Sequence, residues 1–151
     1  MSKKIIFLSN IDRFFVSHRL PIAKQLLLDG YEVYIATEYT TYQKKLIRMG
    51  FKTYNIKFSR NSMNLFKMFV PFFQIFTLLV KIKPSILHLI SIKPIILGGF
   101  LPFILPIKSV VISITGLGSL YIKKSFFFIL RENILNAFLR VIFILPNLNI
   151  I

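Results

Sequence analysis

The sequence contains no cysteine and few acidic residues, whereas basic residues are plentiful. Without cysteine the chain can form neither a disulfide framework nor a thiolate metal site. Twenty Lys and Arg against five Asp and Glu give a formal net charge of +15. Such a charge favours a polyanionic partner, either nucleic acid or an anionic bilayer, unless it reflects compositional bias with solvated charges. No basic helix or aromatic RNA-binding motif is present, so we expect no nucleic acid partner.

Long apolar runs and targeting signals are also missing. A helix that spans a bilayer needs about 18 or more consecutive apolar residues, and residues 68–80, 94–107 and 126–130 are all shorter. The first run contains Pro71 and Gln74. Buried or interfacial helices therefore fit better, with a spanning helix as the alternative. The basic residues near the start are followed by an apolar run too short for a signal peptide, which predicts a cytoplasmic protein.

Several catalytic signatures are absent. The segment after the first apolar run, residues 10–13, contains no glycine, which argues against the G-x-G-x-x-G loop of nicotinamide dehydrogenases. Neither a Walker A motif nor a G-x-S-x-G nucleophile elbow is present. The two histidines, His18 and His88, have no acidic neighbours at ligand spacing, and we expect no metal site.

What the sequence does contain is an alternation of strand and helix patterns. Short apolar or β-branched runs predict strands at residues 5–9, 31–37, 51–56, 86–91, 109–115 and 141–145. Helical spacing predicts helices at residues 17–29, 41–49, 65–83, 94–105 and 125–139, with residues 10–15 as a loop. This alternation predicts an α/β fold in which a parallel sheet of five or six strands carries helices on both faces.

Helix boundaries follow from particular residues. Ser17 is a candidate cap for the first helix, and Pro21 suits its first turn. Thr40 or Thr41 is a candidate cap for the second helix. Glycine is expected to end both helices in the left-handed conformation, at Gly30 and Gly50. The last residues, 146–151, follow the sixth predicted strand without a closing helix, which we interpret as the pattern of a fragment.

Ligands of parallel sheets bind at the carboxyl ends of the strands. The residues that follow the first, fourth and fifth predicted strands are therefore the candidate site. They are residues 10–19, 91–93 and 115–118. Because these segments are far apart in sequence, we expect the fold to bring them to a single cleft.

The same segments carry a family resemblance. Residues 10–23, 30–33, 50–51, 59–62, 83–94, 98–99 and 113–118 occur in an order and spacing that resemble the N-terminal domain of family-four retaining GT-B glycosyltransferases. The resemblance extends from Lys4 to about Phe143 and is nearest to the bacterial branch that acts on undecaprenyl-diphosphate-linked sugars. It implies one Rossmann-like half of a GT-B fold, the half that binds the acceptor, over residues 1–151.

The resemblance also implies what the chain lacks. In the family, a second domain binds the sugar nucleotide through a paired-glutamate motif, whereas Glu132 is the only acid in the C-terminal part of this chain. Many relatives have a glycine-rich loop after the first strand, where this chain has residues 10–13. We therefore expect a truncated chain that is inactive alone, with no cofactor of its own and a UDP- or GDP-sugar as the donor of the complete enzyme.

Site residues follow from the resemblance. His88 is implied to face the cleft as the catalytic residue; a buried core histidine is the alternative. Arg19 and Lys93 suit neutralisation of a diphosphate. The full set implied to bind the acceptor or its phosphates is Asn10, Arg13, His18, Arg19, Arg60, Lys93, Thr115, Gly116 and Gly118. Simple alternatives are a helix-end hydrogen bond for His18 and a tight turn for the glycines.

The predicted function is transfer of a sugar from a nucleotide donor to a lipid-diphosphate-linked saccharide in lipopolysaccharide, capsule or glycan synthesis. A non-catalytic subunit or remnant that needs a separate donor-domain chain is the alternative, and a small basic membrane protein is a weaker one. Basic residues flank the apolar stretches at residues 68–80 and 126–130; they are Lys67, Lys81, Lys83, Lys123, Lys124 and Arg131. Hence we expect peripheral binding to the inner face of the cytoplasmic membrane.

Overall fold

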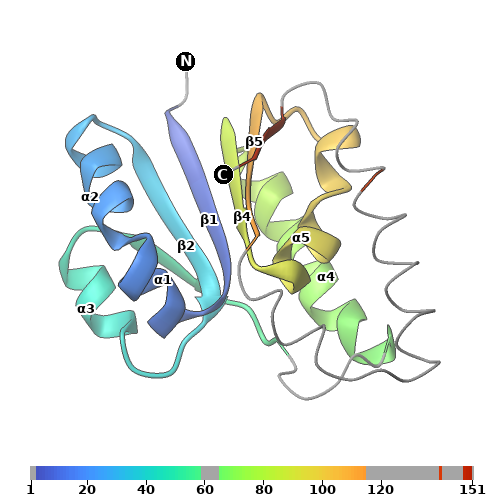
Figure 1. Cartoon of the computed structure of the whole chain (residues 1–151), viewed down its shortest axis with the longest axis horizontal. Coiled ribbons are helices and arrows are strands. Elements are labelled where there is room, and N and C mark those ends of the chain that lie inside the picture. Colours follow the sequence, from blue (N-terminus) through green and yellow to red (C-terminus); the bar gives the residue numbers. More distant parts are fainter. Residues whose placement is uncertain (1–2, 59–64, 115–139, 141–147, 151) are drawn as a thin grey trace.

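The computed structural model describes residues 3–58, 65–114, 140 and 148–150 of the chain. Strands and helices alternate along most of this part (Figure 1). The elements are β1 (Lys4–Ile11), α1 (Asp12–His18), α2 (Leu20–Leu28), β2 (Glu32–Glu38), α3 (Gln43–Arg48), β3 (Lys52–Asn55), α4 (Leu65–Ile82), β4 (Ile86–Ile90), α5 (Ile92–Gly98), the 3-10 helix η1 (Leu101–Phe103), β5 (Ser109–Ser113) and β6 (Leu148–Ile150).

The strands form one parallel sheet in the order β3-β2-β1-β4-β5-β6. On one side of β1 lie β2 and then β3, and on the other side lie β4, β5 and β6. The order therefore reverses between β1 and β4, as in doubly wound folds. This arrangement confirms the predicted parallel α/β fold. The predicted sixth strand at 141–145 lies outside the described residues. β6 lies within residues 146–151, where no strand was predicted.

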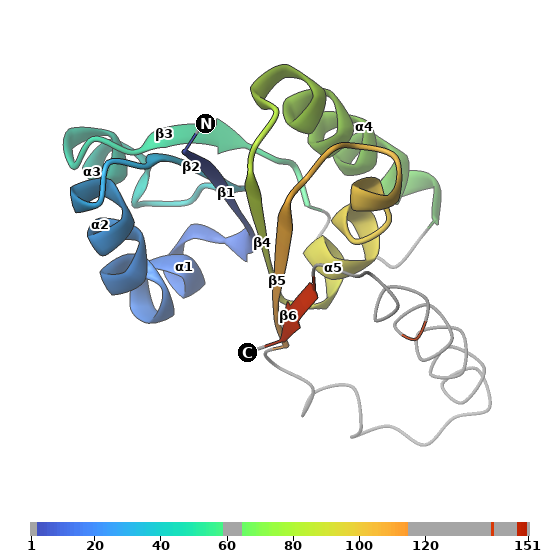
Figure 2. The same ribbon diagram turned by 90° about the horizontal axis from the view of Figure 1, so that it is seen from above.

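Two apolar cores lie on the two faces of the sheet. Figure 2 shows α1, α2 and α3 on one face and α4 and α5 on the other. In β1, Ile5 and Phe7 belong to the core that α1, α2 and α3 cover, whereas Ile6 and Leu8 belong to the core that α4 and α5 cover. Helices cover both faces of β1, so its side chains are buried on both sides, which explains the uninterrupted apolar sequence of residues 5–8.

An additional helix, α1, precedes the predicted first helix, which corresponds to α2. Residues 10–15 were expected to form a loop, but β1 continues to Ile11 and α1 starts at Asp12. The reason is tertiary: Phe15 is fully buried, and its ring packs edge-on against Phe7 with 5.4 Å between centroids. Ser17 is not a cap, because it lies inside α1 and its hydroxyl donates to the Phe14 carbonyl.

Other boundaries follow the sequence more closely. Pro21 lies in the first turn of α2, as predicted. Gly30 and Gly50 follow α2 and α3 with φ of 81° and 91°, which confirms the predicted left-handed stops. The predicted helix 94–105 is wrong in its extent, because α5 ends at Gly98 and a separate 3-10 turn begins at Leu101. Pro102 in that turn cannot donate the backbone hydrogen bond that a continuous helix needs.

None of the described helices is both long enough and apolar enough to cross a bilayer.

Candidate functional site

The candidate site is the edge of the sheet where β1 and β4 end, at the point where the strand order reverses. Ser9 pairs with Ile90 in the parallel register, where β4 ends, and β1 continues beyond this level to Ile11. Ser91, which follows β4, has φ of 76° and ψ of 161°. This backbone conformation is strained for any residue other than glycine, and such strain occurs often at functional sites.

His88 lies on β4 and faces the same side of the sheet as α1. Its side chain is 4% exposed, and its ring lies 5.0 Å from the Phe7 ring. Its Nε2 atom lies 2.7 Å from Oγ of Ser113, which is fully buried on β5. Burial, assisted by the positive charge of Arg19, lowers the pKa of His88 to about 4. The imidazole is therefore neutral at neutral pH, so it can hydrogen-bond but carries no charge.

Arg19 is the residue that connects α1 to α2. Its N–H donates to the Phe15 carbonyl at 2.8 Å, and its carbonyl accepts from the Ala23 N–H at 3.0 Å. These two bonds hold the Arg19 backbone, and the positive charge of its side chain is close enough to His88 to affect the pKa of the imidazole. The Arg19 Nε atom is buried and has no hydrogen-bond partner within the part of the chain that the structure describes. The structure thus places His88 against Ser113 of β5 and within reach of the positive charge of Arg19.

His18 is in a different environment from its neighbour Arg19. It is exposed, and its ring stacks on Phe14 with 4.3 Å between centroids. Its Nδ1 lies 2.6 Å from the Ser17 hydroxyl and 3.2 Å from the Phe14 carbonyl. These contacts are all within α1, and they fit the simple alternative of a helix-end hydrogen bond. Among the described residues, no hydrogen bond or ring contact joins His18 to His88, so their sharing of one cleft stays a prediction.

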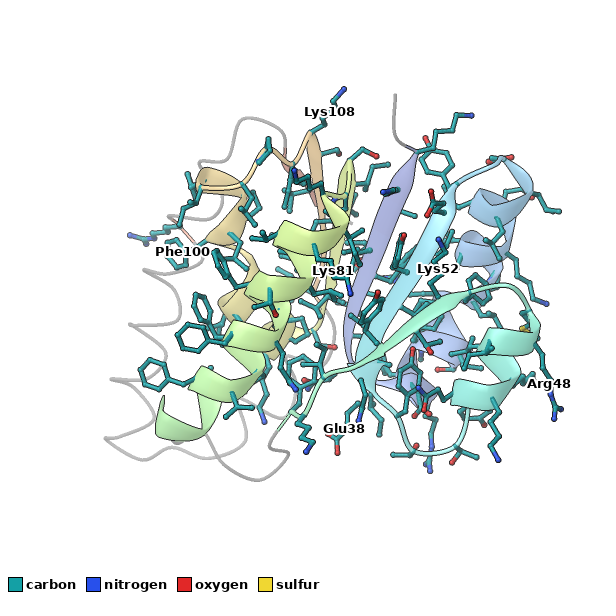
Figure 3. The ribbon with its side chains drawn as sticks, turned by 180° about the vertical axis from the view of Figure 1, so that it is seen from behind. Glu38, Arg48, Lys52, Lys81, Phe100 and Lys108 are labelled. Carbon is teal, nitrogen blue, oxygen red and sulfur yellow. The ribbon has the colours of Figure 1, made fainter. Side chains whose placement is uncertain are left out.

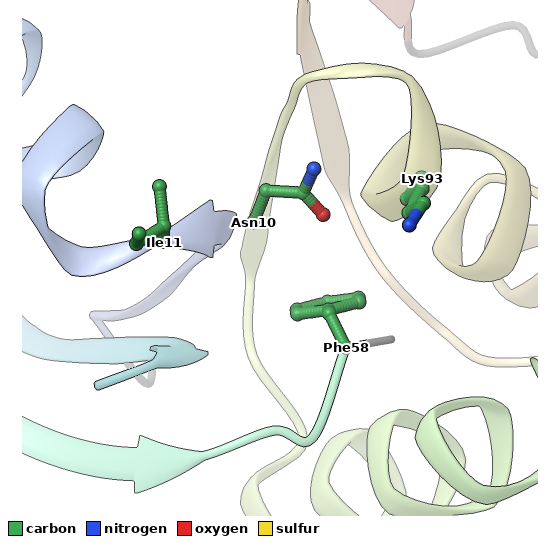
Figure 4. Close-up of a pocket in the computed structure, with 4 residues that line it drawn as sticks. All are labelled: Asn10, Ile11, Phe58 and Lys93. Carbon is green, nitrogen blue, oxygen red and sulfur yellow. The ribbon is translucent and has the colours of Figure 1, made fainter. Parts of the chain in front are cut away.

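Asn10 and Lys93 line a pocket next to the end of β1. The pocket has a volume of about 220 Å³, and Ile11 and Phe58 also line it (Figure 4). Lys93 lies in the first turn of α5; burial lowers its pKa, and the nearby carboxylate of Glu38 opposes this shift. The structure therefore brings together two residues that the sequence placed in separate segments. Phe58 was not predicted, because an aromatic residue just before a polar loop carries no signal of its own.

Sequence reasoning also missed Asp12, which joins two loops at this edge of the sheet. Its fully buried carboxylate accepts hydrogen bonds from the backbone N–H groups of Thr40, Thr41 and Tyr42, at 2.8 to 2.9 Å, and from the Thr40 hydroxyl at 2.7 Å. Burial alone would raise its pKa, but these hydrogen bonds outweigh burial and lower the pKa to about 2. A lone aspartate directly after a buried strand was the only available signal.

The remaining predicted residues add little to this geometry. Arg13 is exposed on α1, and its backbone N–H donates to the Asp12 carboxylate at 2.8 Å. Four predicted residues lie outside the described part of the chain: Arg60, Thr115, Gly116 and Gly118. Within the described part, no three His, Asp or Glu side chains form a group that could hold a metal ion.

Comparison with known proteins identifies the family. The family model described as "Glycosyl transferase 4-like" matches residues 4–145, which is nearly the whole chain. The chain belongs to this family. It is a glycosyltransferase-like domain of the GT-B type, in agreement with the resemblance seen in the sequence. No curated protein matches this sequence.

Solved structures share the fold at low identity. MurG from Acinetobacter baumannii is 19% identical with a TM-score of 0.56, over 74% of this chain and 35% of MurG. The calicheamicin glycosyltransferase CalG4 is 11% identical with a TM-score of 0.55, over 97% of this chain and 44% of CalG4. A UDP-GlcNAc 2-epimerase from Methanocaldococcus jannaschii is 17% identical with a TM-score of 0.58, over 92% of this chain and 37% of the epimerase. The family 4-like chain thus spans less than half the length of these proteins, and it has the Rossmann-like fold of one GT-B half.

Proposed function

We propose that the chain is the acceptor-binding half of a glycosyltransferase that transfers a sugar from a nucleotide donor to a lipid-diphosphate-linked saccharide. The observation that carries this proposal is the family match over residues 4–145, which contains β1 to β5 of the doubly wound sheet. The side chains at the reversal point support it: Asn10 and Lys93 line a pocket there, and Arg19 lies near His88.

The proposal assigns separate tasks to two domains. This chain would bind and orient the acceptor, and a second domain would bind the UDP- or GDP-sugar. Rate enhancement in such a cleft comes mainly from positioning and from electrostatic stabilisation of the leaving diphosphate. Arg19 and Lys93 are the cations of this chain that suit electrostatic stabilisation of the leaving diphosphate. His88, being neutral, would act as a hydrogen-bonding group toward the reacting sugars.

A surface of α4 supports a membrane-bound acceptor. Phe69, Val70 and Phe73 are each 56 to 58% exposed, whereas Ile75 and Leu79 of the same helix pack into the core. Figure 3 views the molecule from the α4 side, with Lys81 labelled near the end of the helix. Exposed apolar side chains next to lysines are typical of helices that lie in the bilayer interface. We therefore place the chain at the inner face of the cytoplasmic membrane in this proposal.

The test is a transfer assay in which the acceptor-binding chain and the donor-binding domain are supplied as separate proteins. The 151-residue chain is combined with vesicles that contain an undecaprenyl-diphosphate-linked sugar and with UDP- or GDP-sugars, with and without a GT-B donor domain. The coding sequence just downstream identifies the domain to use: an in-frame or frameshifted donor domain, or a separate adjacent gene.

We expect a lipid-linked product only when both halves are present. With His88→Gln, the rate should fall by roughly 100-fold, the scale of a lost catalytic hydrogen-bonding or proton-transfer group. Transfer by the chain alone would contradict the assigned division of tasks. Absence of product with every matched donor domain and donor sugar would favour the alternative of a non-catalytic subunit.

A further inference from the structure

The buried contact between His88 and Ser113 bears on which ring nitrogen of the histidine carries the proton. Nε2 of His88 lies 2.7 Å from Oγ of Ser113, and the two residues are 4% and 0% exposed. The contact joins the middle of β4 to the last residue of β5, the strand that pairs with it. A hydroxyl group can donate to a neutral imidazole or accept from it, so the distance alone allows two arrangements.

The hydroxyl hydrogen of Ser113 distinguishes the two arrangements. Within the described part of the chain, the hydroxyl has no hydrogen-bond partner other than Nε2, and it is shielded from solvent. If it accepts from an Nε2–H group, its own hydrogen is left without an acceptor and the lone pair of Nδ1 without a donor. If it donates to Nε2, the ring proton lies on Nδ1, and that N–H group alone is unpaired. Unpaired buried polar groups cost free energy, so the second arrangement is the more stable.

Nδ1 is the ring nitrogen of His88 that a ligand can reach. It makes no hydrogen bond to a described residue, and it is not one of the enclosed polar atoms without a partner, in contrast to Nε of Arg19. The small accessible surface of His88 therefore includes this atom. The Phe7 ring, 5.0 Å away, and the Ser113 hydroxyl restrict how the imidazole can turn. A ring held in this way presents Nδ1 in one direction.

We propose that Ser113 is a positioning residue for His88. Its hydroxyl donates to Nε2 and keeps the ring proton on Nδ1, so that His88 presents a fixed N–H donor at the candidate site. Such a donor suits an oxygen that accepts a hydrogen bond, as the oxygens of the reacting sugars do. What the donor serves rests on the proposed function, whereas the position of the proton is a property of this chain alone.

The first experiment reads the position of the proton in the 151-residue chain. The imidazole nitrogens are labelled with ¹⁵N and observed by NMR at neutral pH, where protonated and unprotonated ring nitrogens have well-separated chemical shifts. The chain has two histidines, and loss of one set of signals in His88→Gln assigns that set to His88. We expect a protonated Nδ1 and an unprotonated Nε2. The opposite pattern would overturn the proposal.

Ser113→Ala removes the donor to Nε2. We expect the Nε2 signal of His88 to move toward the protonated position and the Nδ1 signal to move away from it, because the proton is then shared between the two nitrogens. Ser113→Thr keeps a hydroxyl on the same carbon and should retain the parental pattern. The melting temperature should change by no more than about 4 °C in Ser113→Ala, since one hydrogen bond is lost. An unchanged pattern in Ser113→Ala would show that Ser113 does not fix the proton.

The matched control is Ser9→Ala on β1. Ser9 is also fully buried and pairs with Ile90 at the end of β4, but its hydroxyl donates to the Ile11 carbonyl at 3.4 Å and not to a ring. The ring signals of His88 should stay at their parental positions in this variant. Equal changes in Ser9→Ala and Ser113→Ala would mean that the loss of any buried hydroxyl disturbs the ring, and the assignment of Ser113 would fail.

The transfer assay tests what the fixed donor serves. With a donor domain present, Ser113→Ala should lower the transfer rate about tenfold, the scale of one misdirected hydrogen bond, and Ser113→Thr should restore it. A parental rate in Ser113→Ala would overturn the positioning role. If the NMR pattern is as expected but no donor domain gives transfer with the parent chain, the proposed transferase function fails and the assignment of the proton stands, so that the two failures are distinguishable.

Discussion

His88 shows how its surroundings determine what a single histidine can do. Its ring is buried between Phe7 and Ser113, and burial together with Arg19 lowers its pKa from 6.5 to about 4. An imidazole exchanging protons near neutral pH would need a pKa much closer to 7. The structure therefore favours hydrogen bonding by the neutral ring over proton transfer by a charged one. Sequence alone could not indicate this, because burial and the approach of Arg19 depend on the packing of α1.

The lowered pKa of His88 predicts a loss of stability in mild acid. The unfolded chain binds the proton near pH 6.5 and the folded chain only near pH 4, so the unfolded state holds more protons between these values. Stability should therefore be complete above pH 6.5 and should fall by about 3 kcal/mol as the pH drops to 4.

Urea denaturation of the parent and of His88→Gln across this pH range checks the prediction. The variant has no group that titrates at this position, so its stability should change less over the same interval. Parallel pH curves for the two proteins would show that His88 is not the group responsible. Asp12 does not contribute to the pH dependence in this range, because the stability that comes from its lowered pKa is lost only below about pH 4.

At the scale of elements, Asp12 stabilises a helix other than its own. The start of α3 has no side-chain cap from its own residues, and neither Thr40 nor Thr41 serves as the predicted cap. Instead, the Asp12 carboxylate accepts from the backbone N–H groups of both threonines and of Tyr42, the residue just before the helix. One carboxylate thus fixes the start of α3 relative to the start of α1, and both lie beside the carboxyl end of β1.

Asp12→Asn should therefore destabilise the fold. The amide has one acceptor oxygen, and its NH₂ group would face N–H donors, so several charge-assisted bonds are lost in a buried place. We expect a loss of about 2 to 4 kcal/mol in the free energy of unfolding. Denaturant unfolding measures it from the shift of the midpoint at unchanged slope.

The matched control is Asp29→Asn. Asp29 is exposed, and its carboxylate accepts a hydrogen bond from Gln25. A surface substitution of this kind should change stability by no more than about 0.5 kcal/mol. If the two substitutions cost the same, Asp12 is not the structural tie described here.

The element boundaries show where sequence patterns are sufficient. Gly30 and Gly50 were expected to stop helices, and both have the positive φ that favours glycine. These stops depend on the backbone of one residue, so sequence predicts them well. The start of α1 depends on Phe15 packing against Phe7 and on Asp12 bonding to a distant loop. Such contacts join residues that are far apart in sequence, and a local pattern does not contain them.

At the scale of the whole molecule, charge and exposed apolar residues together predict binding to anionic membranes. The net charge is +15, and the carboxylates of Asp12, Asp29 and Glu32 all accept hydrogen bonds from other residues of the chain. Each Lys or Arg near an anionic leaflet contributes about 1 kcal/mol, which decreases over about one Debye length. Binding should therefore be strong at low ionic strength and weak at high ionic strength.

Vesicle cosedimentation with anionic and neutral lipid, at low and high salt, measures this binding. Phe73→Ser on α4 should weaken binding to anionic vesicles roughly tenfold, because burial of an aromatic side chain in the interface is lost. Leu28→Ser is the control, since Leu28 is 80% exposed on α2, which covers the other face of the sheet. Equal binding to neutral vesicles at all salt concentrations would contradict a peripheral, charge-driven association.

The sequence by itself determined the fold class, the order of the first five strands along the chain and the segments that follow them. It could do so because apolar periodicity and glycine stops are local properties. Only the tertiary structure decided the spatial arrangement: Asn10 and Lys93 beside Phe58 in one pocket, and Arg19 beside His88 on the α1 face. The physical reason is that side-chain burial and hydrogen-bond partners arise when strands distant in sequence pair in one sheet, and no local pattern records which residues will then meet.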